Sequence, residues 1–141
     1  MPSKEKSIKT ALIAWNSGGN LTNNVGVTDY LRYGGISSSS AENSAKIIIP
    51  SNGILTNLIV QLISTNNTNP SPGEGRTRVF TIRKSGIDTE LIVKISDNAI
   101  NGDSDFKLSV NKFDLISLSH QVNSNISQSA IGIASIVLSD K

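Results

Sequence analysis

The apolar residues of this chain come in short runs of isoleucine, leucine and valine, separated by groups of Gly, Asn, Ser and Pro. Such runs, bounded by turn-forming residues, are typical of β-strands, and no strong helical segment lies between them. The runs therefore predict an all-β chain of about eight or nine short strands. The predicted strands cover residues 10–15, 28–33, 45–49, 54–64, 77–84, 90–95, 106–110, 115–118 and 130–138.

Two neighbouring segments give the most specific pairing. Residues 77–84 alternate between apolar and polar side chains, and residues 90–95 do the same after a turn at 85–88. The apolar face of the second segment consists of Leu91, Val93 and Ile95. We expect an antiparallel hairpin with one face on the core. Residues 54–64 also alternate, and their β-branched content predicts a long strand with one apolar and one mixed face.

Strands at this spacing predict an antiparallel sandwich or barrel of two facing sheets. A single jelly roll of about eight strands is the first choice, and an immunoglobulin-like sandwich is the second. Residues 10–141 form the predicted domain, and the polar residues 1–9 form an N-terminal arm that reaches a neighbouring subunit or frays. Residues 65–75 and 97–105 are the predicted long loops, since Pro, Gly and Asx residues are frequent in them.

Size, charge and composition exclude several classes of protein. A chain of 141 residues fits one domain, and a net charge of +2 gives little attraction to nucleic acid or anionic membranes. The chain has no cysteine, which excludes disulfides and thiolate metal sites. Its longest apolar run ends at Pro50, far short of a membrane span, and the N-terminal apolar run is too short for a secretory signal.

Catalytic chemistry has few candidates in this sequence. A serine triad needs a histidine, and the chain has one, His120, with no Gly-x-Ser-x-Gly motif. A histidine at the end of a strand is more often structural than catalytic. Asp88 and Glu90 are the nearest approach to a paired-carboxylate site, although hairpin charges of this kind are usually solvated. We therefore predict a protein that is not an enzyme, with no catalytic residue, cofactor or metal.

Two charged segments allow a binding interpretation as well as a structural one. Residues 97–105 hold oxygen ligands and a glycine, as a calcium loop does, but they lack the EF-hand spacing, and Asx residues also fill ordinary loops. The basic residues Arg76, Arg78, Arg83 and Lys84 are close in sequence. Because few aromatic residues accompany them, we interpret them as a solvated strand edge or as partners in intersubunit salt bridges.

Three segments carry a family resemblance. Residues 80–95, FTIRKSGIDTELIVKI, resemble a hairpin that recurs in virion proteins of tailed phages and large DNA viruses. Residues 108–118 resemble the segment that usually follows, and residues 50–58 fit the strand before its Pro/Gly-rich loop. The pattern is similar to jelly rolls of the trimeric tumour-necrosis-factor and complement type, including viral fibre heads. This chain has Ser85 where the family has Asn and Phe113 where it has Gly, which implies a different local bend before Asp114.

The resemblance implies a non-enzymatic structural protein of the virion, assembled in the host cell as a minor capsid, vertex or fibre-head subunit. Its partners would be copies of itself, as a trimer or higher oligomer, and other capsid proteins. The alternative is a carbohydrate- or receptor-binding sandwich that uses the loops 65–75 and 97–105 to bind a host glycan or receptor. Its candidate aromatic contacts are Trp15, Tyr30 and Tyr33.

Overall fold

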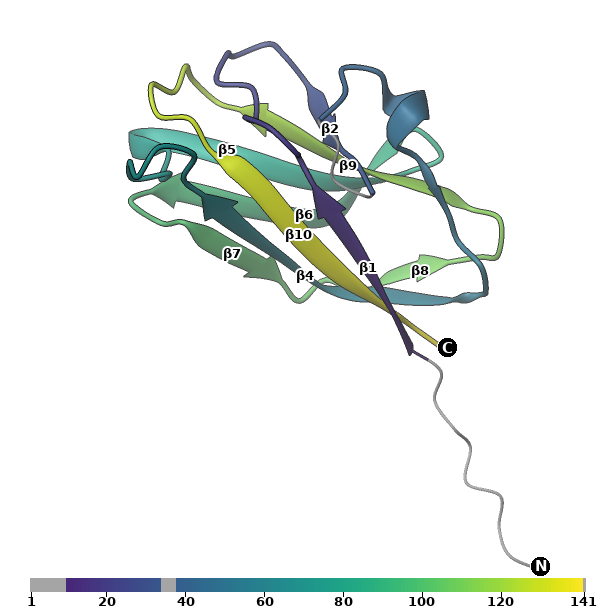
Figure 1. Ribbon diagram of the computed structural model, residues 1–141. Coiled ribbons are helices and arrows are strands. Elements are labelled where there is room, and N and C mark those ends of the chain that lie inside the picture. Colours follow the sequence, from purple (N-terminus) through teal and green to yellow (C-terminus); the bar gives the residue numbers. More distant parts are fainter. Residues whose placement is uncertain (1–9, 34–37, 141) are drawn as a thin grey trace, which may run out of the picture.

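The computed structural model describes residues 10–33 and 38–140, which form two antiparallel β-sheets packed face to face (Figure 1). The predicted arm, residues 1–9, lies outside the described residues. The two-sheet sandwich is confirmed, with ten strands in the described part of the chain. The strands are β1 (Thr10–Asn16), β2 (Asp29–Leu31), β3 (Ile47–Ile48), β4 (Gly53–Ile63), β5 (Gly73–Lys84), β6 (Ile87–Asp97), β7 (Asn101–Ser104), β8 (Leu108–Val110), β9 (Leu115–Val122) and β10 (Ile131–Ser139).

The chain crosses repeatedly from one sheet to the other. The first sheet has the order β1-β10-β4-β7, with β8 pairing β4, and the second has the order β2-β9-β5-β6, with β3 pairing β9. Central strands of both sheets therefore come from distant parts of the sequence, as a jelly roll requires. A short 3-10 helix, η1 (Glu42–Ala45), precedes β3. Within the described residues, no helix has the length and apolar content needed to cross a membrane.

The core lies between the two sheets and is built by the alternation that the sequence shows. In β6, Leu91, Val93 and Ile95 are all buried, as predicted. They face the core beside Phe80 and Ile82 of β5, and the predicted β5–β6 hairpin is present with antiparallel pairing. Leucine and isoleucine from the first sheet complete this single core, so one apolar face of each long strand holds the sandwich together.

Three segments differ from their predictions. Residues 101–104, predicted within a polar loop, form β7 and pair with β4. A short strand at a sheet edge needs little apolar content, so its polar sequence conceals it. The long loop predicted at 65–75 ends earlier, because β5 begins at Gly73. The strand predicted at 45–49 is reduced to β3, since η1 takes up Ala45.

The alternation predicted along residues 54–64 is interrupted by a β-bulge. Asn57 has a φ of 58°, and the pairing of β4 with β10 gains one residue on β4 at this point. The bulge changes the parity of the strand, so that Leu55 and Leu58, three residues apart, are both buried. Asparagine tolerates this left-handed conformation better than most residues. Because of the bulge, β4 supplies buried side chains to the same core both before and after Asn57.

The two positions where this sequence departs from the family pattern both have a positive φ. Ser85 has a φ of 53° beside Gly86 in the β5–β6 turn, and Phe113 has a φ of 76° in the turn before β9. Phe113 therefore has a backbone conformation that glycine adopts readily and other residues rarely adopt. Phe113 adopts it at a steric cost of roughly 1–2 kcal/mol.

Replacing Phe113 with glycine is expected to raise the free energy of unfolding by about 0.5–1 kcal/mol, the steric cost less the greater unfolded-state entropy of glycine. Little packing is lost, because the Phe113 side chain is 69% exposed. Urea unfolding measures the change. The matched control is Phe106→Gly. Phe106 is not among the positive-φ residues, so this substitution relieves no backbone strain and should lower the free energy of unfolding. A loss of stability in both variants would contradict the strain at Phe113.

Candidate interaction surface and a buried polar cluster

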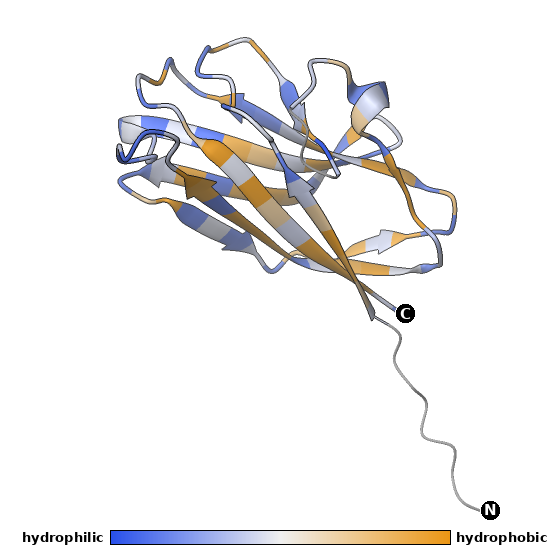
Figure 2. Ribbon diagram, viewed as in Figure 1, coloured by the Kyte–Doolittle hydropathy of each residue, from blue (hydrophilic) through white to orange (hydrophobic). Residues whose placement is uncertain are grey.

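The outer face of the β1-β10-β4-β7 sheet carries large apolar side chains that point away from the core. Leu12 of β1 is 71% exposed, Ile59 of β4 is 51% exposed and Ile133 of β10 is 37% exposed. Leu12 pairs with Val137 of β10, and Ile59 pairs with Ser135 of the same strand, so these side chains lie on one outer face of the sheet. Figure 2 shows β1, β10 and β4 coloured mainly orange to white. We call the outer face of the β1-β10-β4-β7 sheet, with its exposed Leu12, Ile59 and Ile133, the apolar face.

A shallow hollow of about 580 Å³ lies on the apolar face. Leu12, Ile59 and Val137 give it an apolar lining, while Gln61 and Asp103 add polar groups. Asn57, Asn101 and Ser135 also line the hollow, so aliphatic side chains lie among mainly neutral polar groups that can form hydrogen bonds with a partner. The hollow offers a place where an apolar side chain can insert.

The opposite face of the molecule has a different chemistry. The edge strand β6 carries exposed Asp88, Glu90 and Lys94, and the neighbouring β5 presents Arg83 on its outer side. Charged side chains on an edge strand keep it solvated and discourage pairing with another chain. Ile87 of β6 is also 71% exposed, so what distinguishes this charged face from the apolar face is its charge.

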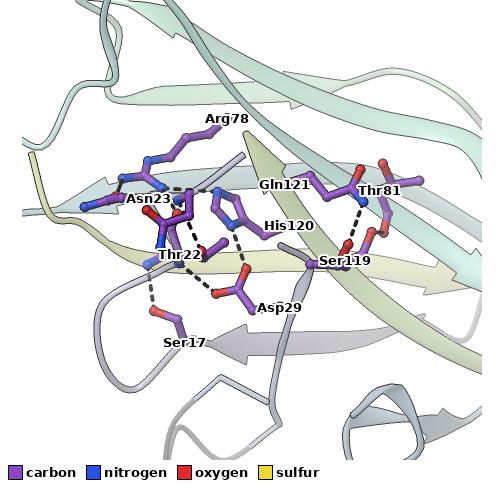
Figure 3. Close-up of polar contacts among 12 residues, drawn as sticks. Ser17, Thr22, Asn23, Asp29, Arg78, Thr81, Ser119, His120 and Gln121 are labelled. Carbon is purple, nitrogen blue, oxygen red and sulfur yellow. Dashed lines mark hydrogen bonds and ion pairs between the residues drawn. The ribbon is translucent and has the colours of Figure 1, made fainter. Parts of the chain in front are cut away.

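A polar cluster is buried inside the sandwich at the end of the molecule away from the C-terminus (Figure 3). It consists of Arg78 on β5, His120 on β9 and Asp29 on β2. Arg78 and His120 have no exposed surface, and Asp29 is 7% exposed. The imidazole lies between the other two groups, with Nδ1 2.7 Å from Asp29 Oδ1 and Nε2 3.3 Å from an Arg78 terminal nitrogen.

Burial shifts the protonation of both bases in the cluster. It lowers the pKa of Arg78 to about 10, with the charge of Asp29 acting in the opposite direction, so Arg78 stays charged at neutral pH. Burial also lowers the pKa of His120, against the hydrogen bond and charge of Asp29, and the charge of Arg78 lowers it further. The cluster therefore combines a guanidinium, a carboxylate and a neutral imidazole.

The cluster does not provide a catalytic triad. A triad requires a serine, threonine or cysteine at the nitrogen of histidine that does not face the carboxylate. Here that nitrogen, Nε2, faces Arg78, and the imidazole ring packs on Phe80 with 4.8 Å between the ring centres. The structural interpretation of His120 fits these contacts. The carboxylate of Asp88 is engaged in an ion pair with Arg83 instead of facing Glu90 in a cleft.

The four basic residues predicted as one solvated edge are separated in the structure. Arg78 is wholly buried, so the prediction is wrong for this residue. Arg76, two positions earlier, is exposed and donates from Nε to the carbonyl of Asn125 at 2.7 Å. The sequence contained the signal for this difference. Strand alternation places Arg78 on the same face as Phe80 and Ile82, which are core residues.

The other two basic residues have partners within the same chain. Arg83 forms ion pairs with Glu42 of η1 and with Asp88 across the hairpin. The Lys84 ammonium lies 4.0 Å from Asp114. These pairs connect the second sheet to η1 and to the turn before β9, so Arg83 has no need of an intersubunit partner.

The fold also separates the residues considered as calcium ligands from one another, and it buries one of the aromatic residues considered as glycan contacts. Asp97 accepts a hydrogen bond from the Gly75 backbone N–H at 2.8 Å, while Asp103 belongs to β7. Among the described residues, no group of three or more metal-ligating side chains is close enough to hold an ion. Trp15 is 1% exposed and packs in the core, so it cannot stack on a sugar, whereas Tyr33 is 73% exposed.

Comparisons with known proteins identify the fold. No protein-family model matches the chain, and no curated protein matches it in sequence. The globular domain of the zebrafish complement 1qA protein superposes with a TM-score of 0.53 at 7% identity, covering 92% of this chain and 96% of that one. This chain has a complement-type jelly-roll fold. Two crystal structures of murine APRIL give TM-scores of 0.46 and 0.47 at 11% and 12% identity, covering 89% of this chain and 98% of each of those.

Proposed function

We propose that this chain is a non-enzymatic structural subunit of a virion, of the minor capsid, vertex or fibre-head type. It assembles with copies of itself, as a trimer or higher oligomer, through the apolar face. The observation that carries the proposal is the set of exposed aliphatic side chains on the outer face of the β1-β10-β4-β7 sheet. The virion role draws on the resemblance of residues 50–58, 80–95 and 108–118 to virion jelly rolls.

Covering the apolar face removes aliphatic surface from water at little cost in desolvated charge. Each square ångström of apolar surface that becomes buried contributes roughly 25 cal/mol. The polar groups among these side chains are mainly neutral, such as Asn57, Gln61 and Ser135, and they can exchange water for hydrogen bonds across an interface. Desolvation therefore favours association on this side of the molecule and opposes it on the charged side.

A second copy of the chain is the partner that this chemistry favours. The apolar face carries little charge, since Asp103 is the charged residue in the lining of its hollow, so it has no strong electrostatic preference for an oppositely charged protein. An apolar, nearly neutral surface is complementary to another of the same kind. Contacts between identical subunits build closed oligomers of the type that capsid and fibre proteins use.

Replacing Ile59 with lysine is expected to lower the affinity of self-association at least about tenfold, because a buried ammonium in the interface core is costly. Asp103 pairs with Ile59 across β4 and β7 and can accept the new charge in the monomer, so folding should survive. Sedimentation velocity over a range of protein concentrations measures the change. The matched control is Ile92→Lys, which places the same charge on the outer face of β6, two residues from Glu90.

Two results would contradict the proposal. A wild-type chain that remains monomeric at high concentration would exclude self-assembly through any surface. Equal loss of association in both variants would exclude the apolar face as the interface. The virion role has its own test, which is to look for the chain by mass spectrometry in purified virus particles. Absence of the chain from particles, with self-association intact, would refute the virion role alone.

A further inference from the structure

Arg78 connects two loops that are far apart in the sequence. Its guanidinium donates to the Thr22 carbonyl at 2.9 Å and to the Asn23 side chain at 2.6 Å, both in the loop 17–28. It also donates to the Gln128 carbonyl at 3.2 Å in the loop 123–130. Both loops lie at the end of the sandwich away from the C-terminus (Figure 1). A single buried cation thus holds together two surface loops.

The carboxylate and the imidazole of the cluster support the same arrangement. Asp29 Oδ2 accepts a hydrogen bond from the Thr22 backbone N–H at 3.0 Å, and Asp29 Oδ1 faces His120 Nδ1. Figure 3 shows these side chains converging from three strands on the loop backbone. The two loops also contact each other directly, through the Ile126 N–H to Asn23 carbonyl bond at 2.9 Å. The loop end is therefore closed by the cluster.

The geometry of the cluster allows one protonation state of His120. A guanidinium can only donate, so Nε2 at 3.3 Å from Arg78 must be the unprotonated acceptor. The proton of the neutral ring is then on Nδ1, where it is donated to Asp29. A second proton on Nε2 turns that contact into two cationic donors facing each other, at a site without solvent exposure. Such a pair is strongly unfavourable in a buried environment.

We propose that Arg78, His120 and Asp29 form an acid-sensitive latch, which holds the loops 17–28 and 123–130 closed when His120 is neutral and releases them when it is protonated. Protonation displaces the guanidinium of Arg78 from Nε2. Its bonds to Thr22, Asn23 and Gln128 are lost with it. The loops separate while the two sheets keep their packing.

The charged and titratable groups that face His120 are Asp29 from β2 and Arg78 from β5. The loop 17–28 contributes only uncharged groups to the cluster, and Phe80 contributes an aromatic ring. Arg78, with a pKa of about 10, keeps its charge between about pH 5 and 7, and His120 is the one histidine of the chain. A transition in this range is therefore assigned to His120.

The direction of the pH effect follows from burial. The pKa of His120 in the folded protein is below the ordinary value of 6.5. The unfolded or opened state consequently takes up the proton first, so the closed state is fully favoured above about pH 6.5 and loses stability as the pH falls below it. Opening also uncovers apolar groups, because Leu21 and Ile126 of the two loops are 2% and 6% exposed.

Hydrogen exchange with mass spectrometry tests the latch on the full chain. After correction for intrinsic rates, exchange in the two loops is expected to be about tenfold faster at about pH 5.5 than at about pH 7. The reason is that about pH 5.5 is one unit below the ordinary pKa of histidine, and each such unit changes the opening equilibrium by about a factor of ten. Exchange in β4 and β6 requires unfolding of the whole sandwich, so it should stay much slower than loop exchange at both pH values and serves as the internal control. Binding of a hydrophobic dye at the lower pH should rise with the loop exchange. The variant His120→Gln, which cannot be protonated, should lose the pH dependence.

If the glutamine variant fails to fold, NMR of the wild-type chain still tests the latch. The NMR signal of the single imidazole reports the protonation of His120 directly, and loop exchange should increase over the same pH range. Protonation without any increase in loop exchange would overturn the latch. Cooperative acid unfolding of both sheets together with the loops would also overturn it, and so would unchanged loop exchange across the range.

Discussion

Replacing Arg78 with methionine is expected to lower the free energy of unfolding by about 3–5 kcal/mol, the usual cost of removing one partner from a buried ionic network. Methionine fills a similar volume but leaves the carbonyls of Thr22 and Gln128 without their donor. It also leaves the buried carboxylate of Asp29 without a nearby guanidinium. Urea unfolding followed by circular dichroism measures the loss.

The same variant should change the response to acid. Without the guanidinium, one of the two causes that lower the pKa of His120 is removed, while burial, the larger cause, remains, so the pKa of His120 is expected to be higher in the variant than in wild type. The variant should then gain stability relative to wild type as the pH is lowered through this range. Arg76→Met is the control, since Arg76 is exposed and should change stability by no more than about 0.5 kcal/mol. Equal effects of both variants would contradict the structural role of Arg78.

The long, periodic strands could be predicted from the sequence because burial follows alternation in them. Leu91, Val93 and Ile95 all face the core, and the hairpin that β6 forms with β5 has the antiparallel pairing that its turn residues indicate. The jelly roll was also predictable in outline, since turn signals separate many short apolar runs. Local pattern is sufficient wherever one face of a strand is buried and the other is solvated.

The polar cluster could not be recognised from local pattern because its members come from three distant strands. Asp29 and His120 are 91 residues apart, and only the pairing of β2 with β9 brings them into register. An arginine within a strand is usually solvated, and that expectation concealed Arg78 until its neighbours Phe80 and Ile82 were seen to be buried. Long-range pairing decides such contacts, and a single sequence does not reveal it.

The sequence contains a signal of the apolar face, because the strands that form it have apolar residues at both inward and outward positions. In β4 and β10, isoleucine and valine occupy outward positions as well as inward ones, as in strands that are covered on both faces. The described residues of this chain cover only the inner faces. The apolar residues at outward positions of these strands, which the core does not require, are therefore the sequence feature on which the proposed interface rests, and β1 shows it at Leu12.

Replacing Trp15 with alanine is expected to lower the free energy of unfolding of the monomer by about 3–5 kcal/mol, because the indole fills the core and its loss leaves a large cavity. Trp15 is 1% exposed on the inner side of β1, opposite Ala134 of β10. Urea unfolding followed by circular dichroism is the suitable measurement, since this is the one tryptophan of the chain and its fluorescence is lost with it.

Leu12→Ala, on the outer side of the same strand, is the matched control. Because Leu12 is 71% exposed, its truncation should change monomer stability by no more than about 0.5 kcal/mol while weakening self-association. The two variants thus separate the inner face of β1, which stabilises the fold, from the outer face, which is the proposed contact with another copy. A large loss of monomer stability from Leu12→Ala, with association unchanged, would show that the outer face serves the fold and would leave the proposed interface without its edge strand.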